Sequence, residues 1–271
     1  MPGKYQWKEM HSITRYMSTT VNIGQIPYLN CEPFFHGLEL DGINLLPMAP
    51  SAMGPLAQQG DLQAAPFSLI QSFNITDRYE TLCDMGISVM GAVRSILLYS
   101  KLPISELSES KIGVTQESAT SSQLLRVILE IKYDVKPEEY TGLDADNSTA
   151  FLLIGDQALE THDKVEGYPY RYDLSEEWFD WQDLPFVFAR WMIMNSVEDS
   201  VKNEIGNRLK NNLANNMAGD LSEIVNKRQF MGIEAGGIEK YLRSFRYLFS
   251  DADQKAIRIF EEAWRSLAPI G

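Results

Sequence analysis

The first part of the chain alternates between short apolar runs and amphipathic segments. Val21-Asn22-Ile23-Gly24-Gln25-Ile26 alternates apolar and polar residues, which is typical of a short β-strand, and Pro27 then indicates a turn. Two further apolar runs predict strands, and the segments between the runs predict short helices. The expected strands are residues 21–26, 43–48 and 62–67, and the expected helices are residues 33–38 and a segment from an N-cap at Ser51 to Gly60. This alternation predicts a parallel α/β sheet.

A second α/β unit follows a long β-rich stretch at residues 86–99. Residues 112–115 predict a strand, and leucines and isoleucines at helical spacing between residues 124 and 129 predict the helix after it. Residues 151–154 and the apolar segment 184–196 predict two more strands. From residue 197 onward the pattern becomes helical, with helices expected at residues 197–217, 219–230, 235–248 and 251–267.

Two long β crossings, near residues 95–105 and 185–196, predict two lobes that the chain connects twice. We expect residues 1–20 to form a tail, residues 21–104 with 190–271 to form a first lobe that includes the C-terminal helices, and residues 105–189 to form the second lobe. This is the layout of the type-II periplasmic-binding-protein fold, an α/β fold. Such a fold holds its ligand in the interlobe cleft, at the carboxyl ends of strands.

Composition and charge narrow the range of functions. The chain has 271 residues, of which 44% are hydrophobic, and a net charge of −13, which argues against nucleic acid or an anionic membrane surface as a partner. No apolar run approaches the roughly 20 residues that span a bilayer. The two cysteines, Cys31 and Cys83, are too few for a disulfide framework, and no Cys/His cluster has metal-ligand spacing, so we expect a cytoplasmic protein without a metal. With three histidines, at positions 11, 36 and 162, a histidine-based catalytic triad is not expected.

If the ligand lies in the cleft, the polar residues just after each strand are the candidate contacts. The candidates that follow strands are Tyr28, Asn30, Ser51, Ser68, Thr120, Ser121, Gly155 and Asp156, and two more, Arg94 and Ser95, lie in the long crossing. Asn30 attracts attention because a buried amide without partners costs roughly 1–3 kcal/mol. Its presence at a strand end therefore indicates that it either ties down a loop or holds a ligand.

For several candidates the residues alone leave two interpretations open. In "TQESATSSQLL", hydroxyls and free backbone N–H groups converge at a helix N-terminus, which is either a carboxylate or phosphate site or a hydroxyl-rich N-cap. Arg94 either pairs with an anionic ligand or bridges the lobes. For Asp156 the capping of the following helix is favoured over a ligand contact. Cys31 is better interpreted as a small core residue than as a nucleophile, and His36 as a satisfied helix residue rather than a base.

Several motifs together resemble one enzyme family. The segments "IGQIPYLNCEPFF", "GAVRSILLYSK", "TSSQLL", "LLIGDQAL", "YDLSEEW" and "LPFVFARW" occur in the order seen in the chorismate dehydratases of the futalosine route to menaquinone. The resemblance runs from about residue 21 to the final helices. It implies a type-II periplasmic-binding-protein fold used as a hydro-lyase, without metal or organic cofactor, which removes water from chorismate to give 3-[(1-carboxyvinyl)oxy]benzoate.

The resemblance also implies roles for individual residues. Asn30 and Ser95 correspond to the family's Leu-Asn asparagine and Gly-x-Val-x-Ser serine, and we expect them to be catalytic. The Thr120-Ser121 and Gly155-Asp156 pairs match substrate-binding segments. The chain departs from the family pattern at Gln71, at Gln182-Asp183 and at Arg190, and these departures leave room for a related anionic substrate.

Two other functions stay open at this point. The same fold serves non-catalytic binding proteins for small carboxylates, because fold alone does not determine function. A related lyase later in the same pathway shares the fold, but its first-strand motif, of Ser-Pro-x-Pro-Asn type, does not match "PYLNCEP". The sequence does not distinguish a monomer from a dimer.

Overall fold

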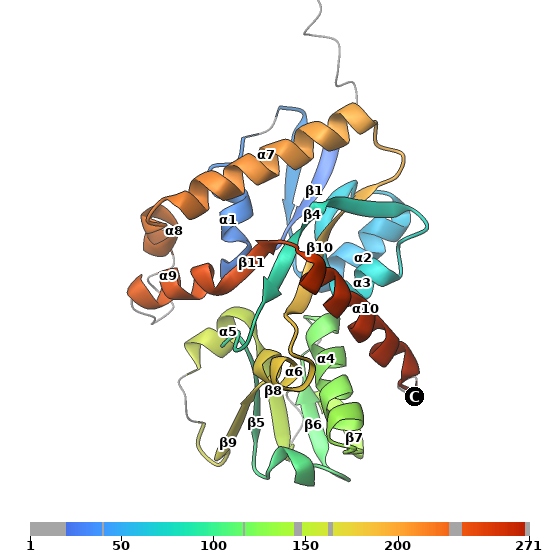
Figure 1. Cartoon of the computed structure of the whole chain (residues 1–271), viewed down its shortest axis with the longest axis vertical. Coiled ribbons are helices and arrows are strands. Elements are labelled where there is room, and N and C mark those ends of the chain that lie inside the picture. Colours follow the sequence, from blue (N-terminus) through green and yellow to red (C-terminus); the bar gives the residue numbers. More distant parts are fainter. Residues whose placement is uncertain are drawn as a thin grey trace, which may run out of the picture.

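The computed structural model describes residues 20–39, 41–115, 117–143, 148–161, 165–227 and 235–268. Two β-sheets lie one above the other and helices cover them (Figure 1). The predicted tail lies outside the described residues except for residue 20, and His11, Gln116 and His162 lie outside them as well. No helix in the described ranges has the length and hydrophobicity that crossing a membrane requires.

The larger sheet has six strands in the order β11-β4-β10-β3-β1-β2. Its strands are β1 (Val21–Gln25), β2 (Ile43–Pro47), β3 (Ala64–Ser68), β4 (Tyr79–Val89), β10 (Phe186–Met194) and β11 (Phe245–Leu248). β1 is parallel to β2 and β3, whereas β10 runs antiparallel to β3 and β4. β4 and β10 approach so closely that a Cβ on Gly86 would overlap the carbonyl oxygen of Ala189. Glycine is therefore required at this crossing.

The smaller sheet has five strands in the order β7-β6-β8-β5-β9. They are β5 (Ile96–Ser100), β6 (Lys111–Val114), β7 (Glu139–Gly142), β8 (Ala150–Ile154) and β9 (Tyr170–Asp173). β6 is parallel to β7 and β8, and β5 is antiparallel to β8 and β9.

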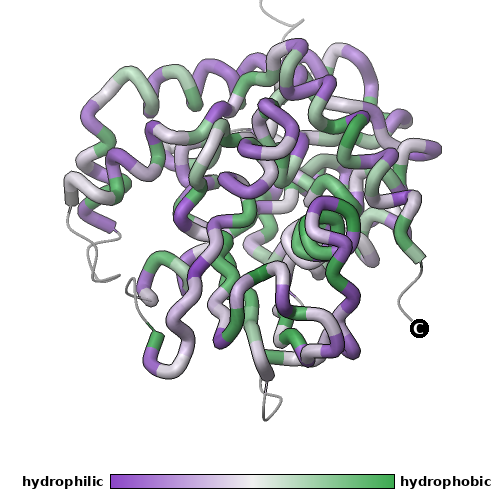
Figure 2. Tube along the Cα trace, turned by 60° about the horizontal axis from the view of Figure 1, so that its bottom comes forward, coloured by the Kyte–Doolittle hydropathy of each residue, from purple (hydrophilic) through white to green (hydrophobic). Residues whose placement is uncertain are grey.

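Helices flank both sheets. Beside the larger sheet are η1 (Leu29–Cys31), α1 (Glu32–Phe35), α2 (Pro50–Gln59), α3 (Leu69–Phe73), α7 (Asp199–Ala218), α8 (Ser222–Lys227) and α9 (Ala235–Ser244). With the smaller sheet are η2 (Ile104–Glu106), α4 (Ala119–Arg126), its π-helical continuation η3 (Val127–Lys132), α5 (Gly155–Glu160) and α6 (Leu174–Gln182). The amphipathic α7 buries Ile205, Leu209 and Leu213, and hydrophilic residues dominate its other positions (Figure 2).

The last helix, α10 (Asp251–Ser266), joins the two halves of the core. It packs against β10 of the larger sheet and against η3 beside the smaller one. Phe260 of α10 lies edge-on to Trp178 of α6 and Phe186 of β10, with ring centroids 5.9 and 4.9 Å away. One hydrophobic cluster thus extends through both halves, so the relative placement of the sheets is fixed by packing as well as by the two connections.

The predicted strands at 43–48, 62–67, 112–115 and 151–154 correspond to β2, β3, β6 and β8 within two residues. Other predictions were wrong. The expected β stretch at 86–99 is two strands in different sheets, β4 and β5, separated by residues 90–95. The helix expected at 235–248 ends at Ser244 and continues as β11, while α2 begins after an N-cap at Ala49 instead of Ser51. The strands β7 and β9 and the helix α6 were not predicted.

Sheet membership also bears on the lobe boundaries. The expected division placed residues up to 104 in the first lobe, but β5 at residues 96–100 pairs with β8 and β9 in the smaller sheet. All of β10, from residue 186, belongs to the larger sheet, although its first residues were assigned to the second lobe. We therefore propose two lobes whose connections lie at residues 90–95 and 183–185.

Candidate active site

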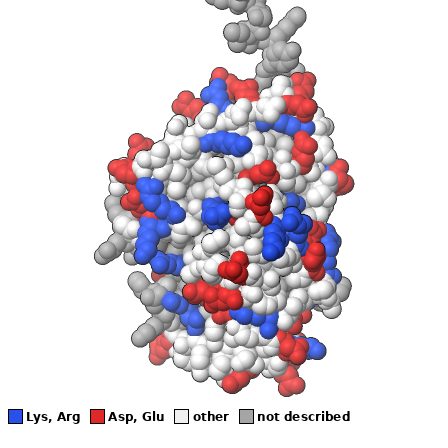
Figure 3. Space-filling view, in the orientation of Figure 1, with Lys and Arg blue, Asp and Glu red and all other residues white. Residues whose placement is uncertain are grey.

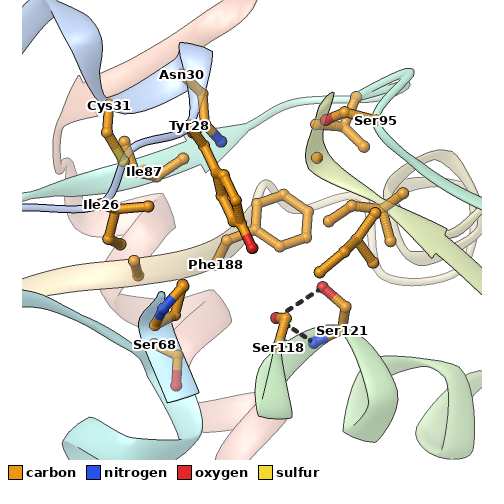
Figure 4. Close-up of a pocket in the computed structure, with 16 residues that line it drawn as sticks. Ile26, Tyr28, Asn30, Cys31, Ser68, Ile87, Ser95, Ser118, Ser121 and Phe188 are labelled. Carbon is orange, nitrogen blue, oxygen red and sulfur yellow. Dashed lines mark hydrogen bonds between the residues drawn. The ribbon is translucent and has the colours of Figure 1, made fainter. Parts of the chain in front are cut away.

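A pocket lies between the two sheets, and both contribute to its lining (Figure 4). Its residues come from segments at the ends of β1, β3 and β8, from the connection before β5, from the start of α4, and from β4 and β10. The polar lining residues are Tyr28, Asn30, Ser68, Ser95, Ser118 and Ser121, and the remaining ones are Ile26, Cys31, Pro50, Ile87, Val93, Ile96, Ile154, Gly155, Phe188 and Ala189. Among these described lining residues there is no lysine, arginine, histidine or carboxylate. A ligand here would therefore meet hydroxyls, one amide and apolar walls.

Asn30 reaches the pocket because the chain turns sharply after β1. Tyr28 has extended dihedral angles before the 3-10 turn η1, which holds Asn30 at its centre. The Oδ1 atom of Asn30 is buried, and no described residue hydrogen-bonds to it. Leaving such an acceptor unpaired costs roughly 1–3 kcal/mol. The amide therefore does not serve to tie down its own loop, and it is available to a ligand.

Ser95 also lines the pocket, from the connection between β4 and β5 (Figure 4). It is 2% exposed. Its backbone carbonyl accepts the N–H of Gly155 at 2.7 Å, and its Oγ accepts the hydroxyl of Tyr241 at 2.9 Å. The preceding Arg94 has φ +65° and is exposed, and its backbone N–H donates to Asp173 at 2.6 Å. Arg94 therefore shapes the turn, and its side chain is absent from the described lining.

The start of α4 brings two serine hydroxyls to the pocket. Ser118 is the N-cap: its Oγ accepts the backbone N–H of Ser121 at 3.3 Å, and the two hydroxyl oxygens are 3.0 Å apart. Thr120, by contrast, is buried away from the lining, and its Oγ1 accepts the backbone N–H of Ile70 at 3.2 Å. Ser118 was not among the predicted site residues, although its position ahead of an apolar helix is a recognisable N-cap signal.

Tyr28 forms one wall of the pocket and connects the two halves of the molecule. Its ring extends from beside Asn30 toward Ser118 and Ser121 (Figure 4), and its hydroxyl donates to Glu117 Oε2 at 2.8 Å. Burial, together with this hydrogen bond, raises the pKa of Tyr28 well above its ordinary value, so the phenol stays protonated. Gly155, at φ +55°, lies against the same ring.

Two further predicted contacts lie outside the lining. Ser51 is exposed in the first turn of α2. Asp156 is half-buried, and its Oδ1 accepts the backbone N–H of Leu29 at 3.3 Å, which links α5 to the turn that carries Asn30. The capping role favoured for Asp156 is not seen, because α5 begins at Gly155 and has no side-chain cap.

The other flagged residues are also accounted for. Cys31 lines the pocket, but burial raises the pKa of its thiol, as fits a core residue. His36 contacts Glu223 at 2.9 Å and Lys227 at 3.1 Å, apart from the pocket. Arg190 donates to Ser72 at 2.7 Å. None of Gln71, Gln182, Asp183 and Arg190 is in the described lining. The departures at these positions therefore do not change the pocket surface directly.

Charge on the molecular surface is mixed. Acidic and basic side chains are interspersed on the face shown in Figure 3, although the chain as a whole carries a net charge of −13. No group of three or more His, Cys, Asp or Glu side chains placed to hold a metal ion occurs within the described ranges.

Comparison with known proteins gives consistent matches along the chain. A family model described as menaquinone biosynthesis matches residues 21–265. A chorismate dehydratase of Thermus thermophilus is 27% identical over 260 residues, which cover 89% of this chain and 94% of that protein.

Solved structures match at lower identity. Protein AF1704 of Archaeoglobus fulgidus has a TM-score of 0.72 at 17% identity, covering 91% of this chain and 97% of that one. The periplasmic aliphatic sulphonate-binding protein SsuA of Escherichia coli has a TM-score of 0.62 at 14% identity, covering 89% and 86%. A Candida albicans protein with the generic periplasmic-binding-protein fold has a TM-score of 0.57 at 11% identity, covering 93% and 92%. The predicted two-lobed periplasmic-binding-protein-like fold is confirmed.

Proposed function

Because the chain belongs to the menaquinone biosynthesis family, we propose that it is a chorismate dehydratase. The observation that carries the proposal is the similarity to the Thermus thermophilus enzyme, which extends over 89% of this chain. The pocket supports it, because Asn30 and Ser95, the two residues expected to be catalytic, line the same cavity.

The proposed reaction converts chorismate into 3-[(1-carboxyvinyl)oxy]benzoate and water. One ring C–H bond and the neighbouring ring C–OH bond break. The C–H electrons become the new ring double bond, the proton goes to a base, and the hydroxyl leaves as water after gaining a proton. Because the ring becomes aromatic, the elimination is strongly downhill. We propose that it needs no metal or organic cofactor, since loss of water involves no net oxidation or reduction and the gain of aromaticity drives the departure of the hydroxyl.

In this proposal, Asn30 and Ser95 hold the reacting ring between them. The Asn30 amide can accept and donate hydrogen bonds at once, so it can bind the ring hydroxyl and fix its orientation. Ser95 accepts a hydrogen bond from Tyr241, so its own proton is free to point toward the departing hydroxyl. Neither group is a strong base. The proton acceptor is then a cleft serine or a carboxylate of the substrate itself.

The substrate carboxylates need donors that replace water. Ser118 and Ser121 present hydroxyls at the N-terminal end of α4, where the helix dipole favours an anion. Ser68, at the end of β3, adds a third hydroxyl on the larger-sheet side. We assign carboxylate binding to these serines. Tyr28 and Gly155 form the wall of the site, and Arg94, Thr120 and Asp156 support it from outside the lining.

The neutral lining favours one alternative. Because the described lining residues include no carboxylate and no histidine, the pocket also suits a protein that binds a small carboxylate without turnover. The cytoplasmic location expected from the sequence stays a prediction under either function.

The deciding experiment is incubation of the purified protein with chorismate. Proton NMR should record the loss of the signals of the protons on the two sp3 ring carbons and the appearance of the aromatic product, with a mock purification from cells that lack the gene as the control for contaminating activity. Unchanged chorismate would overturn the dehydratase. Binding of chorismate measured by calorimetry, without any product, would favour the binding protein.

A further inference from the structure

Behind Ser95 lies a buried tyrosine that the sequence analysis did not single out. Tyr241 of α9 is 5% exposed, and its hydroxyl donates to Ser95 Oγ at 2.9 Å. No other described residue hydrogen-bonds to that hydroxyl oxygen. The two residues are 146 positions apart in the sequence and belong to different parts of the fold.

The direction of this hydrogen bond determines what Ser95 can do. A serine hydroxyl has one proton to donate and two lone pairs that accept. Because Tyr241 occupies a lone pair, the Ser95 proton does not point back at the tyrosine, and it is free to point into the pocket. Burial raises the pKa of Tyr241 far above its ordinary value, so this donor keeps its proton at neutral pH.

The helix that carries Tyr241 also contacts a second part of the site. α9 packs against η1, the turn that holds Asn30. At its own end, Tyr241 is fixed by an edge-on contact with Phe245, at 4.9 Å between ring centroids. One helix thus contacts both Ser95 and the turn that carries Asn30, two polar groups of the pocket lining.

We propose that Tyr241 is a positioning residue of the site, which orients the Ser95 hydroxyl so that its proton is presented to the substrate. This inference rests on the proposed dehydratase function. Tyr241 is absent from the described lining of the pocket, so it acts through Ser95 rather than by contact with the substrate.

The test is Tyr241→Phe, which keeps the ring and removes only the hydroxyl. We expect kcat to fall by about tenfold, as loss of one oriented neutral hydrogen bond would produce, with KM changed less than twofold. Tyr247→Phe is the matched control. Tyr247 is equally buried and also contacts Phe245, but its hydroxyl donates to the backbone carbonyl of Leu242 at 3.4 Å. It should lose stability at most, and its kcat should stay at the wild-type value.

A double-mutant cycle with Ser95→Ala separates positioning from a general structural effect. If Tyr241 acts through Ser95, Tyr241→Phe should lower kcat in the wild-type background but not in the Ser95→Ala background. Equal losses in both backgrounds, or a Tyr241→Phe variant with wild-type kcat, would overturn the positioning role while leaving the dehydratase in place. A wild-type protein that leaves chorismate unchanged would overturn the proposed function and the positioning role with it.

Discussion

Asn30 gives the sharpest prediction, because replacing it should leave the free energy of unfolding unchanged or higher while it lowers kcat/KM. Oδ1 of Asn30 is buried without a described partner, which costs roughly 1–3 kcal/mol in the folded state. Asn30→Ala removes that cost, so we expect the free energy of unfolding to stay unchanged or to rise by up to about 2 kcal/mol. In the complex, the same change removes one accepted and one donated hydrogen bond. At about 0.5–1.5 kcal/mol each, kcat/KM should fall by roughly 5- to 150-fold.

The assay combines thermal unfolding with chorismate turnover. Asn44→Ala, which removes an exposed amide bonded to Asn22 at 3.2 Å, controls for the loss of an amide elsewhere. Asn30→Asp should bind the dianionic substrate more weakly than Asn30→Ala at any pH where the new carboxyl is ionised, because like charges repel. An Asn30→Ala protein that melts several degrees lower and keeps wild-type turnover would refute the reasoning, since the amide would then be structural.

Two further predictions concern the start of α4 and the acid stability of the fold. Ser121→Ala should raise KM several-fold with little change in kcat in steady-state kinetics, because a carboxylate contact is the same in the ground and transition states. Thr120→Val should instead leave the Ile70 N–H unpaired, and urea unfolding should show a free energy of unfolding that is lower by about 1–3 kcal/mol. Burial raises the pKa of Asp253, but hydrogen bonds from Arg246, Ser88 and Ser250 outweigh it and lower that pKa below the ordinary 3.8. The stabilisation from this carboxylate is therefore fully present above pH 3.8 and is lost as the pH falls through the folded-state pKa. Urea unfolding from pH 6 to pH 2 should show a weaker pH dependence for Asp253→Asn than for the wild type.

Much of the fold was predictable because short apolar runs carry a strong local signal. The apolar runs at β2, β3, β6 and β8 are short, rich in aliphatic residues and followed by turn or capping residues, so pattern alone locates them. β11 was not predicted because its local pattern indicates a helix. Residues 245–248 continue the apolar spacing of α9, and they become a strand only because the edge of β4 is free to pair with them. Such pairing depends on tertiary context and not on the local pattern.

The site was largely predictable from the expectation that polar residues just after strands contact a ligand in the cleft. Position after a strand found five of the residues now seen in the lining, Tyr28, Asn30, Ser68, Ser121 and Gly155, and Ser95 was predicted from its place in the long crossing. This expectation failed where a side chain's direction mattered. Thr120 and Ser121 are neighbours in one helical turn, yet one points to Ile70 and the other to the pocket. Tyr241 had no sequence signal, because its contact with Ser95 depends on how α9 docks.

Two of the predicted contacts that lie outside the pocket lining, Thr120 and Asp156, connect the two halves of the molecule instead. Thr120 accepts the backbone N–H of Ile70, and Asp156 accepts that of Leu29, so each joins the smaller-sheet half to a segment next to the larger sheet. Tyr28 and Glu117 make a third such link. These bonds join segments of the two halves that carry lining residues of the pocket, Asn30 on one half and the α4 serines on the other. Because groups that act together on one ligand must lie at a defined separation, polar residues at strand ends are as necessary for setting that separation as for touching a ligand. Polar side chains are therefore expected at strand ends of an α/β fold both for joining the halves and for contacting a ligand. Only the direction in which each side chain points distinguishes these two roles.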